Sequence, residues 1–100
     1  MLRPARPETM RPPGGDPLDL RRLDLNLLLV LDALFQEGTI TRVAQRLQTS
    51  QPTVSTSLGK LRIVLGDELF VRSNGLMQPT ARALQLRAPV AAILQAIRTD

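Results

Sequence analysis

The sequence contains no cysteine and no histidine, and its only aromatic residues are two phenylalanines. Without cysteine there is no disulfide and no thiolate, and without histidine the chain lacks the commonest catalytic base and a usual zinc ligand. Only scattered carboxylates remain, and they offer no acid–base pair that can carry a reaction. We therefore expect no enzymatic activity, no metal and no cofactor.

Long apolar runs are also absent from the sequence. No stretch of about 18 uncharged apolar residues occurs, so no transmembrane helix is predicted. The first 17 residues contain five prolines and lack the apolar segment of a signal peptide. We therefore expect neither a signal peptide nor a membrane partner.

The composition is that of an ordinary soluble globular protein, with 43% hydrophobic and 22% charged residues in a chain of 100. A chain of this length forms one small domain with a limited, mainly aliphatic core. The formal net charge is +4, and 12 of the 13 basic residues are arginine. This excess favours an anionic partner, although a net charge of +4 is a weak indication by itself.

Residues 1–22 form a segment that is rich in proline and arginine. Its prolines disfavour helices and strands, and it has few apolar residues to bury, so we expect it to be disordered. Five arginines against three acidic residues give it a net charge of +2. An extension without a folded role is the simpler interpretation, and a flexible arm that contacts phosphates is the alternative.

Order is expected to begin near Leu23 with a helix of sequence LNLLLVLDALFQEG. Asp24 or Asn26 can cap its start, and Gly38 stands where a glycine commonly ends a helix. Apolar side chains occupy two faces of this helix. The two sets are Leu28, Leu31 and Phe35, and Leu27, Val30 and Leu34. A small core should hold only one set, so the helix is either central or, as we prefer, buried on its second face against a partner.

Residues 40–65 contain two amphipathic helical patterns separated by three polar residues. The apolar positions are Ile40, Val43, Ala44 and Leu47 in the first, and Val54, Leu58, Leu61 and Leu65 in the second. Thr39 or Thr41 can cap the first helix. Ser50 can cap the second, and Pro52 falls in its first turn, where a missing N–H costs nothing. Two helices joined by so short a turn must cross steeply, as in a helix-turn-helix.

A β-hairpin is predicted after Gly66, the residue that ends the second of these helices. Its strands are expected at residues 69–71 and 76–78, and Asn74-Gly75 is a strong turn signal between them. Strands of this length are not stable alone, so they must pack on the helices. A hairpin in this position is the wing of a winged helix-turn-helix, with Arg72 close to its turn.

Residues 80–100 are predicted to form a long helix capped by Thr80 and bent at Pro89. Its apolar positions make a heptad seam of the kind that pairs helices. The seam comprises Ala83, Leu86, Val90, Ile93 and Ile97, with Leu94 beside it. No later segment of this chain can cover the seam, so we expect a homodimer. Its predicted interface residues are Leu86, Val90, Ile93, Leu94 and Ile97.

The predicted fold is therefore mainly α. Three helices and a short β-hairpin wing form a winged helix-turn-helix over residues 23–79, and a linker or dimerisation helix follows over residues 80–100. In such folds the second helix of the helix-turn-helix enters the major groove of DNA.

The exposed face of that helix carries groups suited to reading bases. Gln51 can pair with the N6 and N7 atoms of adenine, and Ser55 and Thr56 can hydrogen-bond to either base type. The ring of Pro52 and the methyl groups of Thr53 and Thr56 can contact a thymine methyl. Together these residues predict a base-reading surface at the start of the helix.

Groups suited to phosphates surround the same helix end. Ser50 and the free N–H groups of the first turn suit an anion. The nearby basic residues are Arg42, Arg46, Lys60, Arg62 and Arg72. Against Asp67 and Glu68, they give residues 39–80 a net charge of +3. Phosphate contacts position a protein and make binding salt-dependent, whereas base contacts specify the sequence.

Each of these features also has an ordinary structural explanation. Ser50 and Pro52 are common at helix starts, and the polar residues after them can be a solvated face. The competing hypothesis is a helical protein-interaction module that uses only the apolar first helix and the terminal seam. That hypothesis gives no reason for Ser-Gln-Pro at the start of an exposed polar face.

Residues 24–84 resemble the N-terminal domain of LysR-type transcriptional regulators. The motifs are A-x-R-L at residues 44–47, S-Q-P-x-V-S at 50–55, L-x-x-L-R at 58–62, L-G-D-x-L-F-V-R at 65–72 and P-T at 79–80. The opening D-L-N-L-L and the F-V-R of the wing are most similar to the branch of the nodulation regulators and the aromatic-acid-responsive activators. Motifs that keep their order and spacing over this length are a specific signal.

The resemblance implies a winged helix-turn-helix and a linker helix that pairs antiparallel with its mate. It implies a dimer that binds double-stranded promoter DNA at partly palindromic sites containing T-N11-A. It also places Arg72 in or near the minor groove and five residues of the second helix in the major groove, which are Gln51, Pro52, Thr53, Ser55 and Thr56. The predicted DNA-binding residues are Arg42, Ser50, Gln51, Pro52, Thr53, Ser55, Thr56, Lys60, Arg62 and Arg72.

Members of the family carry a ligand-binding domain after the linker helix, and with it they form tetramers. This chain ends at Asp100, so it is either an excised DNA-binding fragment or a naturally short relative. We expect no small-molecule effector in this chain, and a cytoplasmic location in association with the nucleoid.

Overall fold

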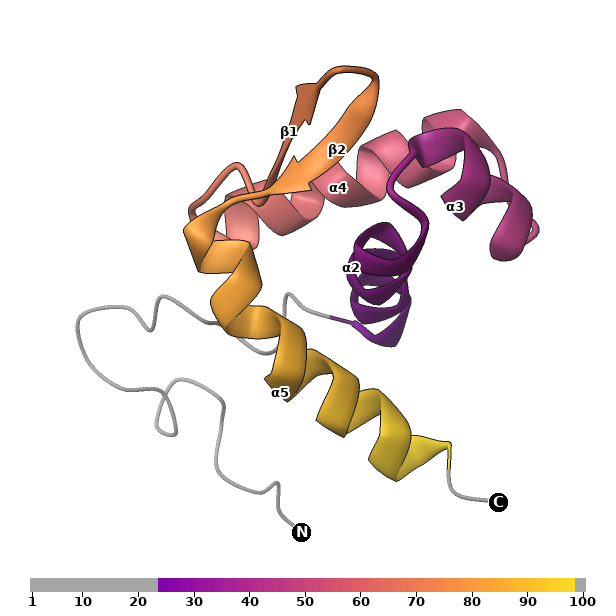
Figure 1. The fold of residues 1–100 in the computed structure, drawn as a ribbon. Coiled ribbons are helices and arrows are strands. Elements are labelled where there is room, and N and C mark those ends of the chain that lie inside the picture. Colours follow the sequence, from indigo (N-terminus) through magenta and orange to yellow (C-terminus); the bar gives the residue numbers. More distant parts are fainter. Residues whose placement is uncertain (1–23, 99–100) are drawn as a thin grey trace, which may run out of the picture.

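Four helices and one two-stranded hairpin make up residues 24–98, the part of the chain that the computed structural model describes. In chain order, the elements are α2 (Leu25–Glu37), α3 (Ile40–Arg46), α4 (Gln51–Leu65), β1 (Phe70–Ser73), β2 (Leu76–Pro79) and α5 (Ala81–Ile97) (Figure 1). The predicted mainly α fold, with a hairpin wing and a long last helix, is confirmed. The predicted disordered leader, residues 1–22, lies outside the described residues, and the division between domains at residues 79 and 80 stays a prediction.

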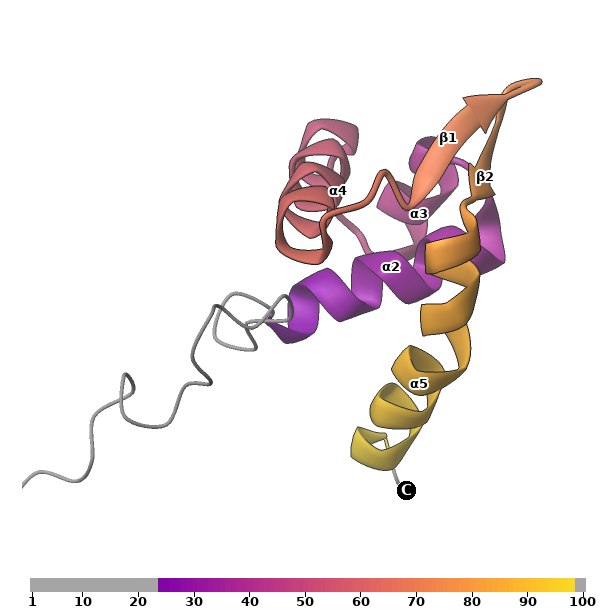
Figure 2. The same cartoon turned by 90° about the vertical axis from the view of Figure 1, so that its left-hand side faces the viewer.

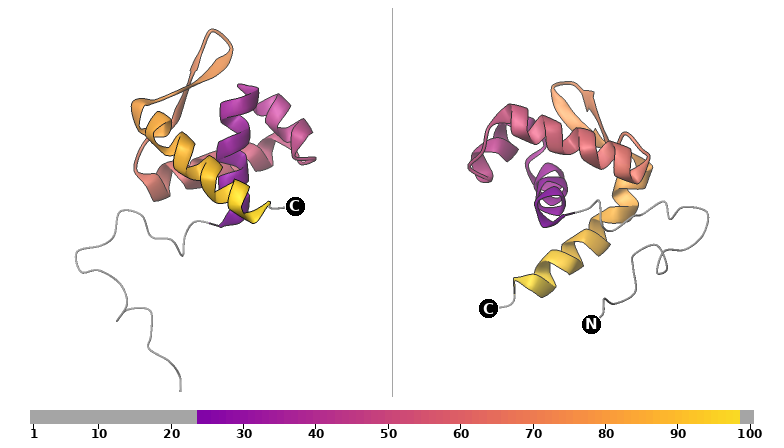
Figure 3. Two further views of the ribbon diagram at one scale, coloured as in Figure 1. Left: turned by 60° about the horizontal axis from the view of Figure 1, so that its bottom comes forward. Right: turned by 180° about the vertical axis from the view of Figure 1, so that it is seen from behind.

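Helix α2 begins and ends where its capping residues predict. The Asp24 carboxylate accepts a hydrogen bond from the Leu27 N–H at 2.9 Å, so Asp24 and not Asn26 is the N-cap. Gly38 ends the helix in the left-handed region, with φ of 81°, and its N–H donates to the Leu34 carbonyl. The views in Figures 2 and 3 agree that α2 lies between α4 on one side and α5 on the other.

The expectation that one small core could hold only one apolar face of α2 is wrong. Leu31 from one face is 0% exposed and Leu34 from the other is 1% exposed, and both belong to the same core. Leu28 and Phe35 are partly buried against that core. Because α3 and α4 cover one side of α2 while α5 covers the other, α2 is the central helix and its second face needs no partner chain.

Helices α3 and α4 form the predicted helix-turn-helix. Thr39, rather than Thr41, caps α3 by accepting from the Arg42 N–H at 3.1 Å. Ser50 caps α4 by accepting from the Thr53 N–H at 3.2 Å. The four predicted core positions of α4 are all buried, and Val64 joins them at 8% exposure.

The hairpin is antiparallel, and its turn is the predicted Asn74-Gly75. Both turn residues have positive φ, 53° and 80°, as the tight two-residue turn of a hairpin requires. Strand β1 begins one residue later than predicted, because Leu69 adopts a left-handed conformation with φ of 66° and lies outside the ladder. The Met77 N–H donates to the Gly38 carbonyl at 2.8 Å, which fastens β2 to the connection between α2 and α3.

Helix α5 starts at its predicted cap, where the Thr80 hydroxyl accepts from the Ala83 N–H at 3.1 Å. The helix is continuous through Pro89, and a bend there stays a prediction. Arg87 lies over the Phe35 ring at 5.5 Å, which adds a cation–π contact to the packing on α2. None of the described helices has the length and apolar character needed to cross a bilayer.

Candidate nucleic-acid interface

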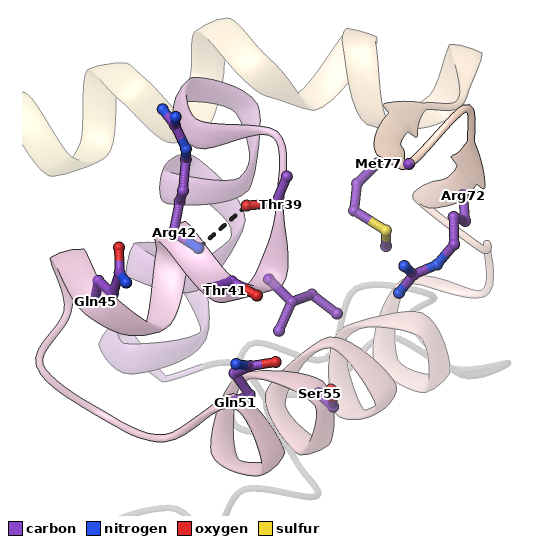
Figure 4. A pocket seen from close by; sticks show the side chains of 10 residues that line it. Thr39, Thr41, Arg42, Gln45, Gln51, Ser55, Arg72 and Met77 are labelled. Atoms are coloured by element: carbon purple, nitrogen blue, oxygen red, sulfur yellow. Dashed lines mark hydrogen bonds between the residues drawn. The ribbon is translucent and has the colours of Figure 1, made fainter.

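A groove of about 530 Å³ separates the inner face of the wing from the starts of α3 and α4 (Figure 4). We call it the wing groove. Its lining residues are Thr39, Ile40, Thr41, Arg42, Gln45, Gln51, Ser55, Arg72, Gly75 and Met77. Four of the ten predicted DNA-binding residues meet there, although they come from three different elements.

The hairpin register explains why Arg72 reaches this groove. Arg72 and Met77 are cross-strand partners, so their side chains leave the hairpin on the same face. Figure 4 shows both side chains extending from the wing toward α4. The guanidinium of Arg72 therefore brings a positive charge to the wing side of the groove.

Gln51 and Ser55 form the α4 wall of the groove. They stand four residues apart on an α-helix, which puts them on one face, one turn from each other. Both are exposed, and Gln51 stands in the first turn of the helix. Their amide and hydroxyl groups supply donors and acceptors at the N-terminal end of α4, the end that a recognition helix presents to base edges.

The remaining polar residues at the start of α4 lie on its other flank. A second surface hollow is lined by Pro52, Thr53, Thr56, Ser57 and Lys60. Thr53 and Lys60 also border a larger hollow between α4 and the start of α2, beside Asn26. The exposed polar residues at the start of α4 therefore lie on two flanks of the helix, with Gln51 and Ser55 on the flank that faces the wing.

Ser50 and Arg62 already have partners inside the chain. The Ser50 hydroxyl lies 2.8 Å from the Thr53 hydroxyl in addition to capping the helix. Arg62 donates to the main-chain carbonyls of Glu68 and Phe70, and its Nε lies 3.5 Å from a Glu68 carboxylate oxygen. Whether either residue also contacts DNA stays a prediction.

Arg46 lies near α4 in the sequence, but its side chain contacts α2. Its guanidinium donates to Gln36 at 2.6 Å and forms an ion pair with Glu37 at 3.0 Å. Gln36 in turn donates to Asp32, a residue only 8% exposed. This network fastens α3 to α2 and occupies the Arg46 guanidinium.

Several groove residues were not predicted from the sequence. Thr41 and Gln45 lie one turn apart on α3 and face the groove, and Met77 closes it from β2. The i to i+4 spacing of Thr41 and Gln45 on a helix that starts beside α4 was a usable signal. Met77 also had a signal, because the predicted two-residue turn at Asn74-Gly75 places it opposite Arg72 in the hairpin.

The predicted dimer residues of α5 differ in how far they are buried within this chain. Val90 and Leu94 are 5% and 2% exposed, and Leu86 is partly buried against the same core. These three side chains pack within the chain because α5 lies against α2. Only Ile93 and Ile97 of the predicted set remain open, at 48% and 58% exposure.

A helix-turn-helix whose second helix borders a groove under a two-stranded hairpin defines a winged helix-turn-helix protein. Residues 25–84 match the model of the bacterial regulatory helix-turn-helix proteins of the lysR family. The chain belongs to this family. Membership supports the DNA-binding interpretation, and the alternative of a helical interaction module without DNA binding is not supported.

Two curated proteins are similar to more than two thirds of this chain. The transcriptional regulator LeuO from Escherichia coli (strain K12) is 49% identical over 81 residues, which are 81% of this chain and 26% of LeuO. Nodulation protein D 1 from Bradyrhizobium sp. (strain NC92) is 46% identical over 68 residues, 68% of this chain and 22% of that protein. The predicted resemblance to the nodulation regulators is confirmed. The chain spans about a quarter of the length of these relatives.

Solved structures share the fold. A crystal structure of a probable transcriptional regulator from Pseudomonas aeruginosa superposes with a TM-score of 0.76 at 52% identity, over 82% of this chain and 27% of that one. A crystal structure of a CbnR_DBD-DNA complex superposes with a TM-score of 0.70 at 25% identity, over 75% of this chain and 86% of that one.

Proposed function

We propose that this chain binds double-stranded promoter DNA with α4 in the major groove and the wing at the neighbouring minor groove. Gln51, Ser55 and Thr56 read base edges, and Arg72 contacts the minor groove or its phosphates. The observation that carries the proposal is the wing groove, where the Gln51 amide and the Ser55 hydroxyl of α4 share one hollow with the Arg72 guanidinium of the wing. The CbnR complex supports it, since a protein of this fold was solved with DNA.

The phosphate contacts come from residues at the borders of α4. Arg42 lines the groove from α3, and Lys60 lies on the opposite flank of α4. Cations on both sides of a recognition helix suit the two phosphate strands that border a major groove. Ser50, Pro52 and Thr53 lie at the N-terminal end of the same helix, where its N–H groups favour an anion.

The same proposal includes a homodimer formed through α5. Residues 88–97 contain no charged side chain, and Ile93 and Ile97 are exposed on that stretch. An exposed helix face without charges suits burial against a second copy. A dimer presents two copies of α4, which fits a partly palindromic site. A tetramer would be a property of a longer parent protein.

The proposed location is the cytoplasm, in association with the nucleoid, and the chain is proposed to have no catalytic activity of its own. Both proposals are supported by membership in a family of bacterial regulatory proteins.

The test is an electrophoretic mobility shift with genomic fragments at two salt concentrations. We expect the chain to retain a few specific fragments, with an affinity that falls steeply as salt rises, because each neutralised phosphate adds to the salt dependence. Failure to bind any DNA at low salt would overturn the proposal. Equal binding to all fragments would remove its sequence-reading part.

A further inference from the structure

Arg62, near the end of α4, donates two hydrogen bonds to residues 68–70, where the chain enters β1. We call these residues the root of the wing and the two bonds the Arg62 fork. Its Nε donates to the Glu68 carbonyl at 2.8 Å, and its Nη2 donates to the Phe70 carbonyl at 2.7 Å. The planar guanidinium offers several donors in a fixed geometry, so one side chain can hold two carbonyls in a set relation. The fork joins α4 to the start of β1, which are the two elements that carry Ser55 and Arg72.

The Phe70 carbonyl needs a donor from outside the hairpin. Hydrogen-bonded pairs alternate along an antiparallel ladder, so every second residue turns its main-chain groups away from the partner strand. Phe70 is paired with Pro79, which has no N–H to offer, and Phe70 itself is 0% exposed. A buried carbonyl without a partner is destabilising, and Arg62 supplies the partner.

The second strand of the wing, β2, is also held by a hydrogen bond to another part of the chain. Met77 pairs with Arg72 and stands in the same phase of the ladder as Phe70, and its N–H donates to the Gly38 carbonyl at 2.8 Å. The wing is therefore fastened at two points, by α4 through Arg62 and by the connection between α2 and α3 through Gly38.

The two carbonyls that Arg62 holds flank a strained residue. Leu69 has a φ of 66°, which is rare for a bulky side chain, and it is 0% exposed. Its N–H donates to the Asp67 carboxylate at 2.8 Å, and its carbonyl accepts from the Thr80 N–H at 2.9 Å. With all these bonds made, the direction in which β1 leaves the helical core is determined.

Arg72 follows Phe70 by two residues on β1. A strand rises about 3.3 Å per residue, so Arg72 lies about 7 Å along the strand from the held carbonyl. A tilt at the root therefore moves the Arg72 guanidinium across the groove relative to Ser55 and Gln51. We propose that Arg62 is a positioning residue for DNA recognition, which sets the wing angle and so places Arg72. This inference rests on the proposed function, in which Arg72 contacts DNA.

The first test is a double-mutant cycle in the full chain. The probe is the duplex that wild-type protein selects from random-sequence DNA. We expect Arg72→Ala and Arg62→Ala each to weaken binding by roughly tenfold, and the double variant to lose no more than either single one. We also expect the slope of log affinity against log salt to fall by about one in all three variants, because one phosphate contact is lost. Losses that multiply, with a slope lowered by two, would show that Arg62 contacts DNA itself and would overturn the inference.

Two further variants separate geometry from charge. Arg62→Lys keeps the positive charge but cannot reproduce the fork, so we expect it to lose most of the affinity that Arg62→Ala loses. Wild-type affinity in Arg62→Lys would overturn the inference. The matched control is Arg98→Ala, at the exposed end of α5, which removes one arginine and should change affinity less than twofold.

A measurement without DNA separates this inference from the proposed function. Residual dipolar couplings of the main-chain N–H groups report how β1 and β2 are oriented relative to α4. We expect the hairpin couplings to change in Arg62→Lys while those within α2, α3 and α4 keep their wild-type values. An unchanged wing orientation would overturn the inference even if the chain binds DNA as proposed. A changed orientation would support it even if no specific DNA site were found.

Discussion

Gln51 and Ser55 are the two residues of α4 that share the wing groove with Arg72. The two side chains differ in how well they can distinguish one base from another. A glutamine amide can donate to one atom and accept from another, which matches the N7 and N6 edge of adenine, whereas a serine hydroxyl accepts several patterns. At the residue scale, Gln51 is therefore expected to contribute more to specificity than Ser55.

We predict that Gln51→Ala lowers discrimination between the selected duplex and a scrambled duplex by about 1–3 kcal/mol, because one bidentate base contact is lost. Competition binding at one salt concentration measures the difference. Binding to the scrambled duplex should change little, since the phosphate contacts remain. The control is Gln95→Ala on α5, which removes an exposed amide far from the groove. Equal losses on both duplexes would mean that Gln51 does not read bases.

The sequence shows several arginines in or near α4 but does not show which role each of them has. Arg62 lies in α4, and Arg42, Arg46 and Arg72 lie near that helix in the sequence. A guanidinium is the same group at each position. Folding separates them, because the partners of Arg62 are main-chain carbonyls and the partners of Arg46 come from α2. Those acceptors exist in the right place only after the helices have packed, so no local pattern reveals them.

At the scale of elements, the turn between α3 and α4 carries backbone strain. Gln48 has a φ of 56°, and the Thr49 N–H donates to the Ala44 carbonyl at 2.9 Å across it. This is the position after a helix where glycine is usual, because glycine has no Cβ to oppose the left-handed conformation. A glutamine there is held by the bonds on either side of it.

We predict that Gln48→Gly stabilises the chain by about 1 kcal/mol, because it removes the cost of a left-handed side-chain residue. Urea unfolding followed by circular dichroism gives the change in unfolding free energy. The matched control is Gln45→Gly, three residues earlier and inside α3, which should destabilise by about 1 kcal/mol. If both substitutions destabilise equally, the strain at Gln48 contributes nothing.

The joint between α4, the wing and α5 depends on the Asp67 carboxylate. The Thr80 hydroxyl donates to it at 2.7 Å and the Leu69 N–H at 2.8 Å. These bonds favour the charged form and lower the pKa of Asp67 below its usual 3.8, with Thr80 as the larger cause. Because Thr80 also caps α5, one carboxylate links the wing root to the start of that helix.

We predict that, because of these hydrogen bonds to Asp67, the free energy of unfolding decreases as the pH is lowered. The unfolded chain binds the Asp67 proton at a higher pH than the folded chain, so the stability from Asp67 is present above pH 3.8 and is lost as pH falls below it. When unfolding is followed at several pH values, the free energy of unfolding should decrease less in Asp67→Asn and in Thr80→Ala than in wild type as the pH is lowered. Thr80→Ser keeps the hydroxyl and should behave as wild type. An acid loss as large in Asp67→Asn as in wild type would contradict the assignment.

The elements differ in how far local chemistry predicts them. Ser50 and Thr80 were identified as caps from sequence, and Asp24 was one of two candidates for its helix, because a cap bonds to an N–H only three residues away. The sequence did not reveal that both apolar faces of α2 are buried within the chain, or that Val90 and Leu94 of α5 pack in the same core. Each depends on which helix covers which face, and apolar spacing is the same whether the cover comes from the same chain or from another.

For the whole molecule, the packing of α5 decides what surface is left for assembly. The side of α5 that carries Ala83, Val90 and Leu94 is used against α2, so the helix contributes to the core of its own chain. The exposed apolar side chains Ile93 and Ile97 border that packed side. A second copy can therefore add to the existing packing without exposing the core.

We predict that Ile93→Asp converts the proposed dimer to a monomer while the chain stays folded, because the charge is placed on an exposed position and not in the core. Sedimentation velocity gives the oligomeric state, and circular dichroism checks the fold. The control is Gln95→Asp, which adds the same charge about 200° further around the helix. Affinity for a duplex with two half-sites should fall roughly a hundredfold, and affinity for a single half-site should not change, because only the linkage between the two recognition helices is lost. A dimer that persists in Ile93→Asp would place the interface elsewhere.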